Sequence, residues 1–452
     1  MTGVRSGTGT GIGIGAPPWA LGLVAIATAA LALIARRPEQ VLRAEFTNED
    51  GQVFFIGTFF GGPFETLLRP HGGYLHFAPR LIAELERLVD TANAPLVGNV
   101  SALLVTLVVA CYVGSHRLSD VIPNRGLRLA AGATIILLPN VSETHAAAMY
   151  TNFYLGALLL AIALARTPES RIGKVIDLLL AGIASLSGPV CVLVAPLFVA
   201  RAARARDRFS VMLAGTVLVA ASIQFVLTWA LGRFAHVGPL EIGAIARVVT
   251  MELWALSIGA TWTTVLDSLG LPVPFVLVGT AALAVLVGLT LSALPRWLAW
   301  RLAMVGVVLV ALSIPSMGLD SDGPENPFLL SRYFLVPSVA MALLVVAALA
   351  RVSEVGRVAR MATIVVAGLF VFAIVGDFRL PSRPDLDWPE RSACIGGESP
   401  CVVPVTIVEV WSIEWPGAAG PYVQPEPQLN RLRPTAGRAT VSLSYDPCRR
   451  LT

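Results

Sequence analysis

The chain has 452 residues, of which 55% are hydrophobic and only 14% are charged, with a formal net charge of +4. Soluble domains carry about 25% charged residues, and one water-soluble core of this size cannot bury so many apolar side chains. The composition therefore excludes a cytosolic enzyme, a secreted globular domain and a disordered protein, and it indicates a polytopic membrane protein.

The N-terminal segment is rich in glycine between Gly7 and Gly15. It follows no predicted strand and opens no nucleotide-binding helix, so we interpret it as a flexible cytosolic tail. Lys174 is the only lysine of the chain, and its context is not that of a phosphate-binding loop. We expect no nucleic-acid partner.

Apolar segments dominate the rest of the chain. A helix needs about 20 apolar residues to cross a bilayer, and eleven segments predict an all-α polytopic membrane protein with about eleven transmembrane helices. A few segments are short, which leaves tilted, broken or re-entrant helices open. The first segment is interpreted as an uncleaved helix rather than a signal peptide, because ten more follow it. The segments are 18–36, 95–113, 127–139, 150–165, 174–187, 188–200, 210–231, 271–294, 300–316, 333–350 and 361–376.

Arginine distribution predicts the orientation. With the N-terminus in the cytoplasm, the short inside loops hold 15 positive charges and the short outside loops hold only Arg332. We therefore predict a multi-pass protein of the plasma (inner) membrane with an extracytoplasmic C-terminus. The long outside stretches are then 37–94, 232–270 and the tail, so that a transmembrane domain 1–376 precedes an extracytoplasmic tail 377–452.

The first outside stretch, 37–94, carries an acidic pair close to the end of the first helix, Glu49-Asp50. A carboxylate just above the bilayer can accept a proton from a hydroxyl; the structural alternative is a solvated loop charge. Apolar spacing over Leu81–Leu88 predicts an amphipathic helix on the membrane surface.

A basic and aromatic run follows the acidic pair and holds Arg69, His71, Tyr74, His76 and Arg80. Arginine and histidine at a membrane surface suit a phosphate, and the alternative is contact with anionic lipid headgroups or snorkelling. The spacing of the two histidines suits no standard metal site, so we expect no metal.

Two other outside clusters border apolar segments. Glu143 and His145, followed by Asn152, need partners or water near a membrane edge; part of this cluster is also explained as a helix cap. Arg332 and Tyr333 open the tenth segment. We expect Arg332 to hold a lipid phosphate, with an interfacial anchor beside Tyr333 as the alternative.

The tail 377–452 is rich in proline, and its stretch Val402–Ile413 reads as one or two strands. Cys394 and Cys401 are seven residues apart in a compartment that permits disulfides. A bridge between Cys394 and Cys401 is one interpretation; the alternatives are that Cys448, the odd cysteine of the tail, pairs with Cys401 instead, or that the cysteines stay unpaired. The tail is thus predicted to be a small β-containing unit.

Two motifs resemble a known family: Glu49-Asp50-Gly51 after the first helix, and the run from Gly73-Tyr74 to Pro79-Arg80. With the overall layout, they resemble the GT-C superfamily of polytopic membrane glycosyltransferases, most closely an uncharacterised bacterial branch. In that family the first extracytoplasmic loop carries a catalytic acidic residue and amphipathic surface helices. About eleven helices and a C-terminal extracytoplasmic part are common there.

The resemblance implies an inverting transfer of a sugar from a lipid-linked polyprenyl-phosphate donor to a cell-envelope glycan, lipid or protein, as in polysaccharide biosynthesis. Asp50 or Glu49 would be the general base. Arg69, His71, Arg80 or Arg332 would stabilise the leaving phosphate. The family implies no cofactor, and a metal is left open but not expected. The remaining candidates for the cavity are Tyr74, His76, Glu143, His145, Asn152 and Tyr333.

Three rival functions stay open. A transporter or flippase of lipid-linked or envelope precursors places ionisable residues at mid-membrane and often shows two related halves, whereas this sequence shows no internal repeat. A polymerase or ligase of surface polysaccharide would carry its main functional loop late in the chain. A non-enzymatic scaffold would tolerate any change at Asp50.

Overall fold

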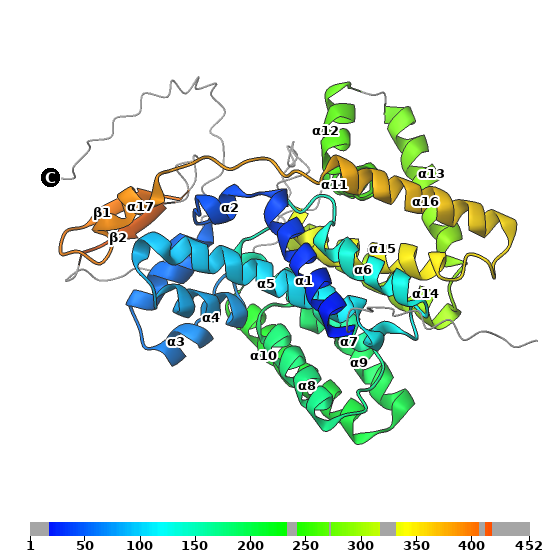
Figure 1. Cartoon of the computed structure of the whole chain (residues 1–452), viewed down its shortest axis with the longest axis horizontal. Helices are drawn as coiled ribbons and strands as arrows, with labels where there is room; N and C mark the ends of the chain where they lie inside the picture. The colour runs from blue at the N-terminus through cyan, green and yellow to red at the C-terminus, as the bar shows by residue number, and fades with distance from the viewer. Residues whose placement is uncertain (1–17, 233–241, 271–272, 317–330, 406–411, 418–452) are drawn as a thin grey trace, which may run out of the picture.

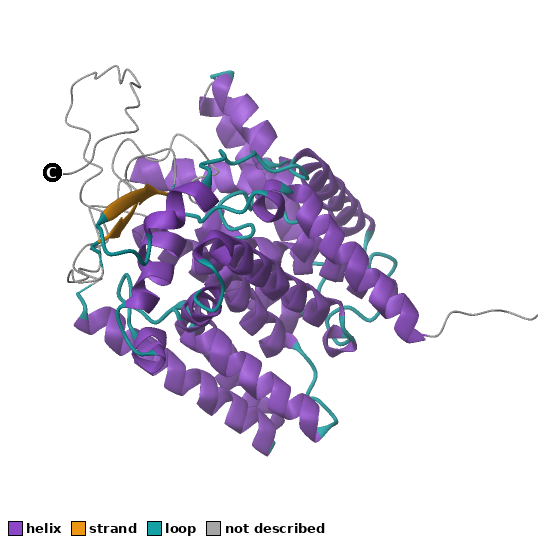
Figure 2. Ribbon diagram, turned by 60° about the vertical axis from the view of Figure 1, so that its left-hand side comes forward, coloured by secondary structure: helices purple, strands orange, loops and turns teal. Residues whose placement is uncertain are grey.

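The computed structural model describes residues 18–232, 242–270, 273–316, 331–405 and 412–417. The predicted N-terminal tail, Cys448 and the rest of the tail beyond residue 417 lie outside the described residues. Within them the chain is mostly helical, with two short strands at one corner (Figure 2).

Every apolar segment that the sequence marks as a span lies on a helix. The helices are α1 (Pro18–Arg36), α5 (Ala94–Gly114), α6 (Arg125–Ile136), α7 (Thr151–Leu164), α8 (Arg171–Leu186), α9 (Val190–Ala205), α10 (Arg208–Ala230), α13 (Val273–Leu291), α14 (Arg296–Ser316), α15 (Ser331–Leu349) and α16 (Arg357–Gly376). Among the described residues, five helices are long and apolar enough to cross a membrane, namely α5, α10, α13, α15 and α16. These helices are consistent with a membrane protein, while eleven spans and the orientation stay predictions.

The centre of the bundle is α7, which packs against α5, α8, α9 and α15. Its side chains are apolar all round and nearly all buried, the pattern of a helix enclosed by other helices. The helix α13 is the opposite case, because its apolar side chains are mostly exposed. Such a face suits contact with lipid.

Small residues allow α5 and α6 to approach closely. A Cβ on Gly132 of α6 would lie 2.6 Å from the Ala110 carbonyl oxygen and 3.2 Å from the Gly114 Cα of α5. Close backbone approach at small residues is a usual way of joining membrane helices.

The described residues of the stretch 232–270 are helical, whereas the sequence is interpreted as a long loop there; its position outside the membrane stays a prediction. Its described residues form two helices, α11 (Ile242–Ile258) and α12 (Ala260–Ser268), and α11 packs against α13, α15 and α16. Arg247 and Glu252 interrupt the apolar pattern of α11, which shortened the run below the length of a span. Glu252, to which the sequence assigns no role, is buried against Asn140.

The first loop, 37–94, folds into short helices. These are α2 (Glu39–Leu42), a π-helix (Asp50–Phe55), a 3₁₀ helix (Ile56–Phe59), α3 (Pro63–Leu68), α4 (Phe77–Glu86) and a second 3₁₀ turn (Thr91–Asn93). The helix α4 begins ahead of the predicted amphipathic segment. It buries Ile82 and Ala83 but leaves Leu81 and Leu85 40% and 44% exposed, so an apolar face remains available for a membrane surface.

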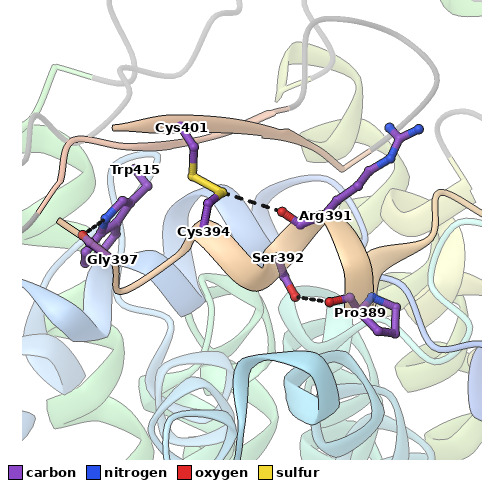
Figure 3. Close-up of a disulfide and its surroundings, with 7 residues drawn as sticks. All are labelled: Pro389, Arg391, Ser392, Cys394, Gly397, Cys401 and Trp415. Atoms are coloured by element: carbon purple, nitrogen blue, oxygen red, sulfur yellow. Dashed lines mark hydrogen bonds between the residues drawn. A yellow bond between two sulfur atoms is a disulfide. The ribbon is translucent and has the colours of Figure 1, made fainter. Parts of the chain in front are cut away.

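The chain returns to the first loop after α16. A segment that we term the strap, residues 377–388, runs along the edge of the bundle from α16 to α17 (Trp388–Arg391) and a small hairpin (Figure 1). The hairpin pairs β1 (Cys401–Pro404) with β2 (Ser412–Trp415) in antiparallel register, with Cys401 opposite Trp415. Cys394 and Cys401 form a disulfide, and the Trp415 indole donates to the Gly397 carbonyl oxygen at 2.9 Å (Figure 3).

Aromatic packing fixes this unit on the first loop. The Trp388 ring meets Phe46 edge-on at 4.8 Å, and the Trp388 indole donates to the Thr91 carbonyl oxygen at 2.9 Å. Ile413 of β2 lies against Gly51, where a Cβ would come within 2.9 Å of its side chain. The predicted tail unit therefore covers the helix that carries the acidic pair.

Candidate functional site

Charged and polar side chains gather at one end of the bundle, where the first loop, the segment 137–150 and the strap meet. We term this the first-loop end. Arg36, the last residue of α1, is fully buried there and donates to the carbonyl oxygens of Ile136 and Leu138 at 2.7 and 2.8 Å and of Asp377 at 3.1 Å. One guanidinium thus joins the end of α1, the segment after α6 and the start of the strap, which are far apart in sequence. It holds these three segments in position around the site.

Asp50 begins the π-helix and holds the first loop to the segment before α7. Asn48 adopts a left-handed conformation, with φ of 46°, which turns the chain into this helix. The two Asp50 carboxylate oxygens accept the backbone N–H groups of Ala148 and Met149 at 3.1 and 2.5 Å. Burial raises the pKa of Asp50 to about 7, while the hydrogen bond from Met149 opposes that rise.

Glu49 precedes Asp50 and has a different environment. Its side chain is half-buried, and its carboxylate forms no hydrogen bond with another residue in the described part of the chain. Burial raises the pKa of Glu49, the positive charge of Arg332 lowers it, and Glu143 raises it further. The carboxylate of Glu49 therefore faces the charged groups of the site without being held by them.

Glu143 and Arg332 form the central ion pair of the site. The Arg332 backbone N–H also donates to Glu143 Oε2 at 3.2 Å, and the Tyr150 hydroxyl donates to Glu143 Oε1 at 3.3 Å. Asn48 Nδ2 and Arg332 Nη1 donate to the Tyr150 oxygen at 3.1 and 3.2 Å. The Arg332 guanidinium lies 4.9 Å from the centre of the Tyr333 ring, an attractive cation–π arrangement.

The strap adds an arginine that the sequence analysis missed. Arg383 donates to Thr47 Oγ1 and, at 3.4 Å, to the Glu143 carbonyl oxygen. Burial lowers the pKa of Arg383, and the nearby charge of Asp50 opposes this most. Arg383 lies in a proline-rich stretch without a motif, so no sequence signal connected it with a site formed 336 residues earlier.

The histidine-rich run folds around Phe54 and forms a second group, which we term the Phe54 cluster: His71, Tyr74, His76 and Arg80. Gly72 and Gly73 take φ of 55° and 90° and form a two-residue turn that pairs His71 with Tyr74. The Tyr74 and His76 rings stack at 4.2 Å. Arg80 is fully buried, donates to the Val53 carbonyl oxygen at 3.2 Å and lies 4.7 Å from the Phe54 ring centre. These contacts assign the cluster to the interior of the first loop.

The contacts described for Arg69, His145 and Asn152 do not involve the Glu143–Arg332 pair. Arg69 forms an ion pair with Glu65 at 2.7 Å and donates to the Phe60 carbonyl oxygen, within the region of α3. His145 is buried, and burial with the charges of nearby arginines lowers its pKa well below the ordinary value. Asn152 is buried in the first turn of α7 against Gly188.

Buried carboxyl groups surround the site, and sequence reasoning gave them no role. Glu86 of α4 is fully buried, and burial together with the Asp50 charge raises its pKa well above the ordinary value. Glu252 of α11 accepts a hydrogen bond from Asn140 Nδ2 at 2.9 Å. Asp377 accepts backbone N–H groups of Asn140 and Ala260 at 3.0 and 2.7 Å, which caps α12.

In the part of the chain that the structure describes, no group of three or more His, Cys, Asp or Glu side chains is placed to hold a metal ion. Glu143 is bonded to Arg332 and Tyr150, Asp50 and Asp377 are bonded to backbone N–H groups, and Glu252 is bonded to Asn140.

No protein-family model matches this chain, and no curated protein sequence matches it significantly. The chemistry of the first-loop end is therefore the basis on which a function can be assigned.

Proposed function

We propose that the protein is a membrane glycosyltransferase that transfers a sugar from a polyprenyl-phosphate donor to an acceptor hydroxyl of the cell envelope. One observation carries this proposal most strongly. The carboxylates Glu49 and Asp50 directly follow two residues that are bonded at one end of an apolar helical bundle: Thr47 accepts from Arg383, and Asn48 shares the Tyr150 oxygen with Arg332. A base for a hydroxyl and cations for a phosphate are the groups that this reaction needs.

Glu49 is our candidate for the general base. A base must be within reach of the proton that it takes, and this requirement comes before its pKa. Both Asp50 oxygens are occupied by backbone N–H groups, and the side chain is 2% exposed. The pKa of Asp50, about 7, would suit a base, yet its geometry suits a residue that positions Glu49 and the π-helix. The Glu49 residue is less buried than Asp50, and no backbone N–H group of another described residue occupies its carboxylate, so Glu49 is better placed to meet an acceptor.

Arg332 is our candidate for the leaving phosphate, with Arg383 beside it. A guanidinium binds phosphate oxygens through charge-assisted hydrogen bonds. Arg80, in contrast, is enclosed by Val53 and Phe54, so we assign it to the support of the first loop. In the proposed step, Glu49 takes the acceptor proton while the acceptor oxygen bonds to the anomeric carbon. The bond from that carbon to the phosphate oxygen breaks, and the configuration inverts.

The proposed orientation puts the first-loop end outside the cytoplasm, where nucleotide sugars are absent and a lipid-linked donor is required. The exposed leucines of α4 then lie at the membrane surface from which such a donor enters. Under this proposal the protein needs no resident cofactor, and it works in the plasma membrane on a glycan, lipid or protein acceptor.

A transporter or flippase of lipid-linked precursors is the second candidate, because of one observation. Glu252 lies in the middle of the apolar helix α11 and is 3% exposed. Buried acidic residues within membrane helices often belong to ion or substrate pathways. Under this alternative, Glu252→Gln stops export of a precursor, whereas Glu49→Gln has no effect.

The test compares envelope glycans and lipid-linked sugars by mass spectrometry in a deletion strain and in the strain restored with each variant. We expect the deletion to shorten a glycan by a sugar and to accumulate a polyprenyl-phosphate sugar. Wild type corrects both defects. Glu49→Gln keeps the side-chain size but removes the base, so transfer falls by about 10²–10⁴-fold.

Asp385→Asn is the matched control, because it removes a carboxylate from an exposed ion pair with Arg43 and should restore the glycan. If Glu49→Gln restores the glycan fully, Glu49 is not the base, and Asp50→Asn is the next variant to test. A deletion that leaves every glycan and lipid-linked sugar unchanged would refute the transferase proposal.

A further inference from the structure

Glu143 occupies an anion site. Its carboxylate is contacted by the Arg332 guanidinium, by the Arg332 backbone N–H at 3.2 Å and by the Tyr150 hydroxyl at 3.3 Å. The Glu143 side chain is 10% exposed and that of Arg332 is 27% exposed. Three donors thus converge on one carboxylate in a place that solvent reaches only partly.

The same three donors are those that bind a phosphate. A guanidinium, a backbone N–H at a helix start and a hydroxyl form charge-assisted bonds with phosphate oxygens as they do with carboxylate oxygens. The Tyr150 oxygen already accepts hydrogen bonds from Asn48 and Arg332. Its own proton is therefore directed to an anion, here Glu143. A phosphate on Arg332 needs the place that this carboxylate fills.

Charge balance supports competition rather than joint occupancy. Two carboxyl groups act on the Arg332 guanidinium, namely Glu143, which pairs with it directly, and Glu49. A phosphate entering beside an ionised Glu143 would bring a further negative charge to a guanidinium that two carboxyl groups already face. Like charges in a partly dehydrated site repel strongly.

We propose that Glu143 is a built-in competitor that occupies the phosphate position on Arg332 until a lipid-linked phosphate displaces it. The inference rests on the proposed function and adds a regulation of the same site. Binding of the donor then breaks the Glu143–Arg332 ion pair and frees Tyr150 to donate to the phosphate. With the position filled by Glu143, Arg332 does not retain stray anions.

The experiment measures the affinity of the purified full chain in detergent for farnesyl phosphate by calorimetry. Farnesol is the uncharged control, and inorganic phosphate is the control without a lipid chain. The variants are Glu143→Gln, Arg332→Gln and, as matched control, Asp385→Asn. We expect Glu143→Gln to bind farnesyl phosphate about tenfold more tightly than wild type, with unchanged farnesol binding. Arg332→Gln should bind farnesyl phosphate no more tightly than farnesol.

Several results would overturn the inference. Equal or weaker binding of farnesyl phosphate by a folded Glu143→Gln protein shows that Glu143 supports the phosphate site instead of blocking it. Unchanged binding by Arg332→Gln places the phosphate elsewhere, while a lipid-phosphate donor still stands. If wild type and Glu143→Gln both bind farnesyl phosphate no better than farnesol, the proposed donor class itself fails. A gain with inorganic phosphate as large as that with farnesyl phosphate identifies a free-phosphate site.

A second variant keeps the test decisive if Glu143→Gln does not fold. Glu143→Asp keeps the charge on a shorter side chain, which weakens its contact with Arg332. We expect its affinity for farnesyl phosphate to lie between those of wild type and Glu143→Gln. An affinity at or below the wild-type value contradicts the inference.

Discussion

At the residue scale, Glu49 and Asp50 show how neighbouring carboxylates acquire different environments. Asp50 is fixed by the backbone N–H groups of Ala148 and Met149, whereas Glu49 faces Arg332 without a hydrogen bond in the described part of the chain. Sequence alone found the pair, because two carboxylates close to the end of the first helix are conspicuous. It did not separate them, since the partners come from a loop about 100 residues away.

The pKa of Asp50 predicts a pH-dependent stability. Burial raises it to about 7 from its usual 3.8, so the ionised form destabilises the fold. We compare the free energy of unfolding of the wild type with that of Asp50→Asn. The contribution of Asp50 to this free energy is fully present below about pH 4. It is lost as the pH rises through about 7, on the order of 1 kcal/mol per pH unit. Thermal unfolding in detergent at several pH values measures this difference. A difference that stays constant between pH 4 and 7 contradicts the burial of Asp50.

Other residues of the site show the limit of sequence reasoning. Glu143 and Arg332 were identifiable, because charged residues beside apolar segments need partners; that they pair with each other required the structure. Arg383 was not identifiable, since a lone arginine in a tail carries no pattern. Arg80 matched the expected chemistry of a phosphate site but is enclosed by Val53 and Phe54. Residue type alone therefore does not distinguish an arginine at the site, such as Arg332, from an arginine enclosed in the first loop, such as Arg80.

At the element scale, hydrophobic runs predicted helices well. Each of the eleven apolar segments lies on a helix, because long apolar runs favour helices in any nonpolar environment. The helix α11 is not among these segments, because Glu252 interrupts its apolar run and the sequence is interpreted as a loop there. The buried Glu252 accepts a hydrogen bond from Asn140. The residues next to Glu252 in the sequence do not reveal this tertiary contact.

The contact between α5 and α6 yields a prediction about packing. Gly132→Ala places a Cβ 2.6 Å from the Ala110 carbonyl oxygen, which is backbone and has no rotamer to change. We expect a loss of about 1–3 kcal/mol in stability. Gly288→Ala in α13 is the control, because a Cβ there meets nothing within 4 Å, and alanine favours a helix over glycine by about 1 kcal/mol. Thermal unfolding of both variants in detergent measures the contrast, and equal shifts would contradict the packing.

At the scale of the whole molecule, the C-terminal hairpin is a cover for the first loop. Its core joins Phe46, Phe55 and Trp388 with Ile413 and Trp415, and the Cys394–Cys401 disulfide closes it. The hairpin touches the π-helix at Gly51, so loosening the tail should loosen the acidic pair.

The disulfide can be tested separately from the site. We expect Cys394→Ser to lower stability by about 2 kcal/mol, because the bridge restricts the unfolded chain. It should also speed proteolytic cleavage of the tail, which limited proteolysis with mass spectrometry reports. Cys111→Ser changes a free cysteine and serves as the control. Identical cleavage rates for the two variants would mean that the bridge does not hold the hairpin.

The orientation of the whole chain can be tested through its single lysine. Lys174 lies in the first turn of α8, at the end that the arginine distribution assigns to the cytoplasm. A membrane-impermeant amine reagent should modify Lys174 only after the cells are permeabilised, and peptide mass spectrometry locates the product. Modification in intact cells would reverse the orientation and, with it, the side on which the proposed donor binds.

The contact between Arg383 and Thr47 also sets an order of events during synthesis. The two residues are separated by 336 positions, and ribosomes add about 5–20 residues per second, so roughly 17–70 s pass between them. Throughout that interval, the acidic pair has emerged while its strap has not yet been made. A prematurely terminated product therefore lacks Arg383 and the hairpin cover. Completion of the chain becomes the step that assembles the site, and truncated products left in the membrane should be inert.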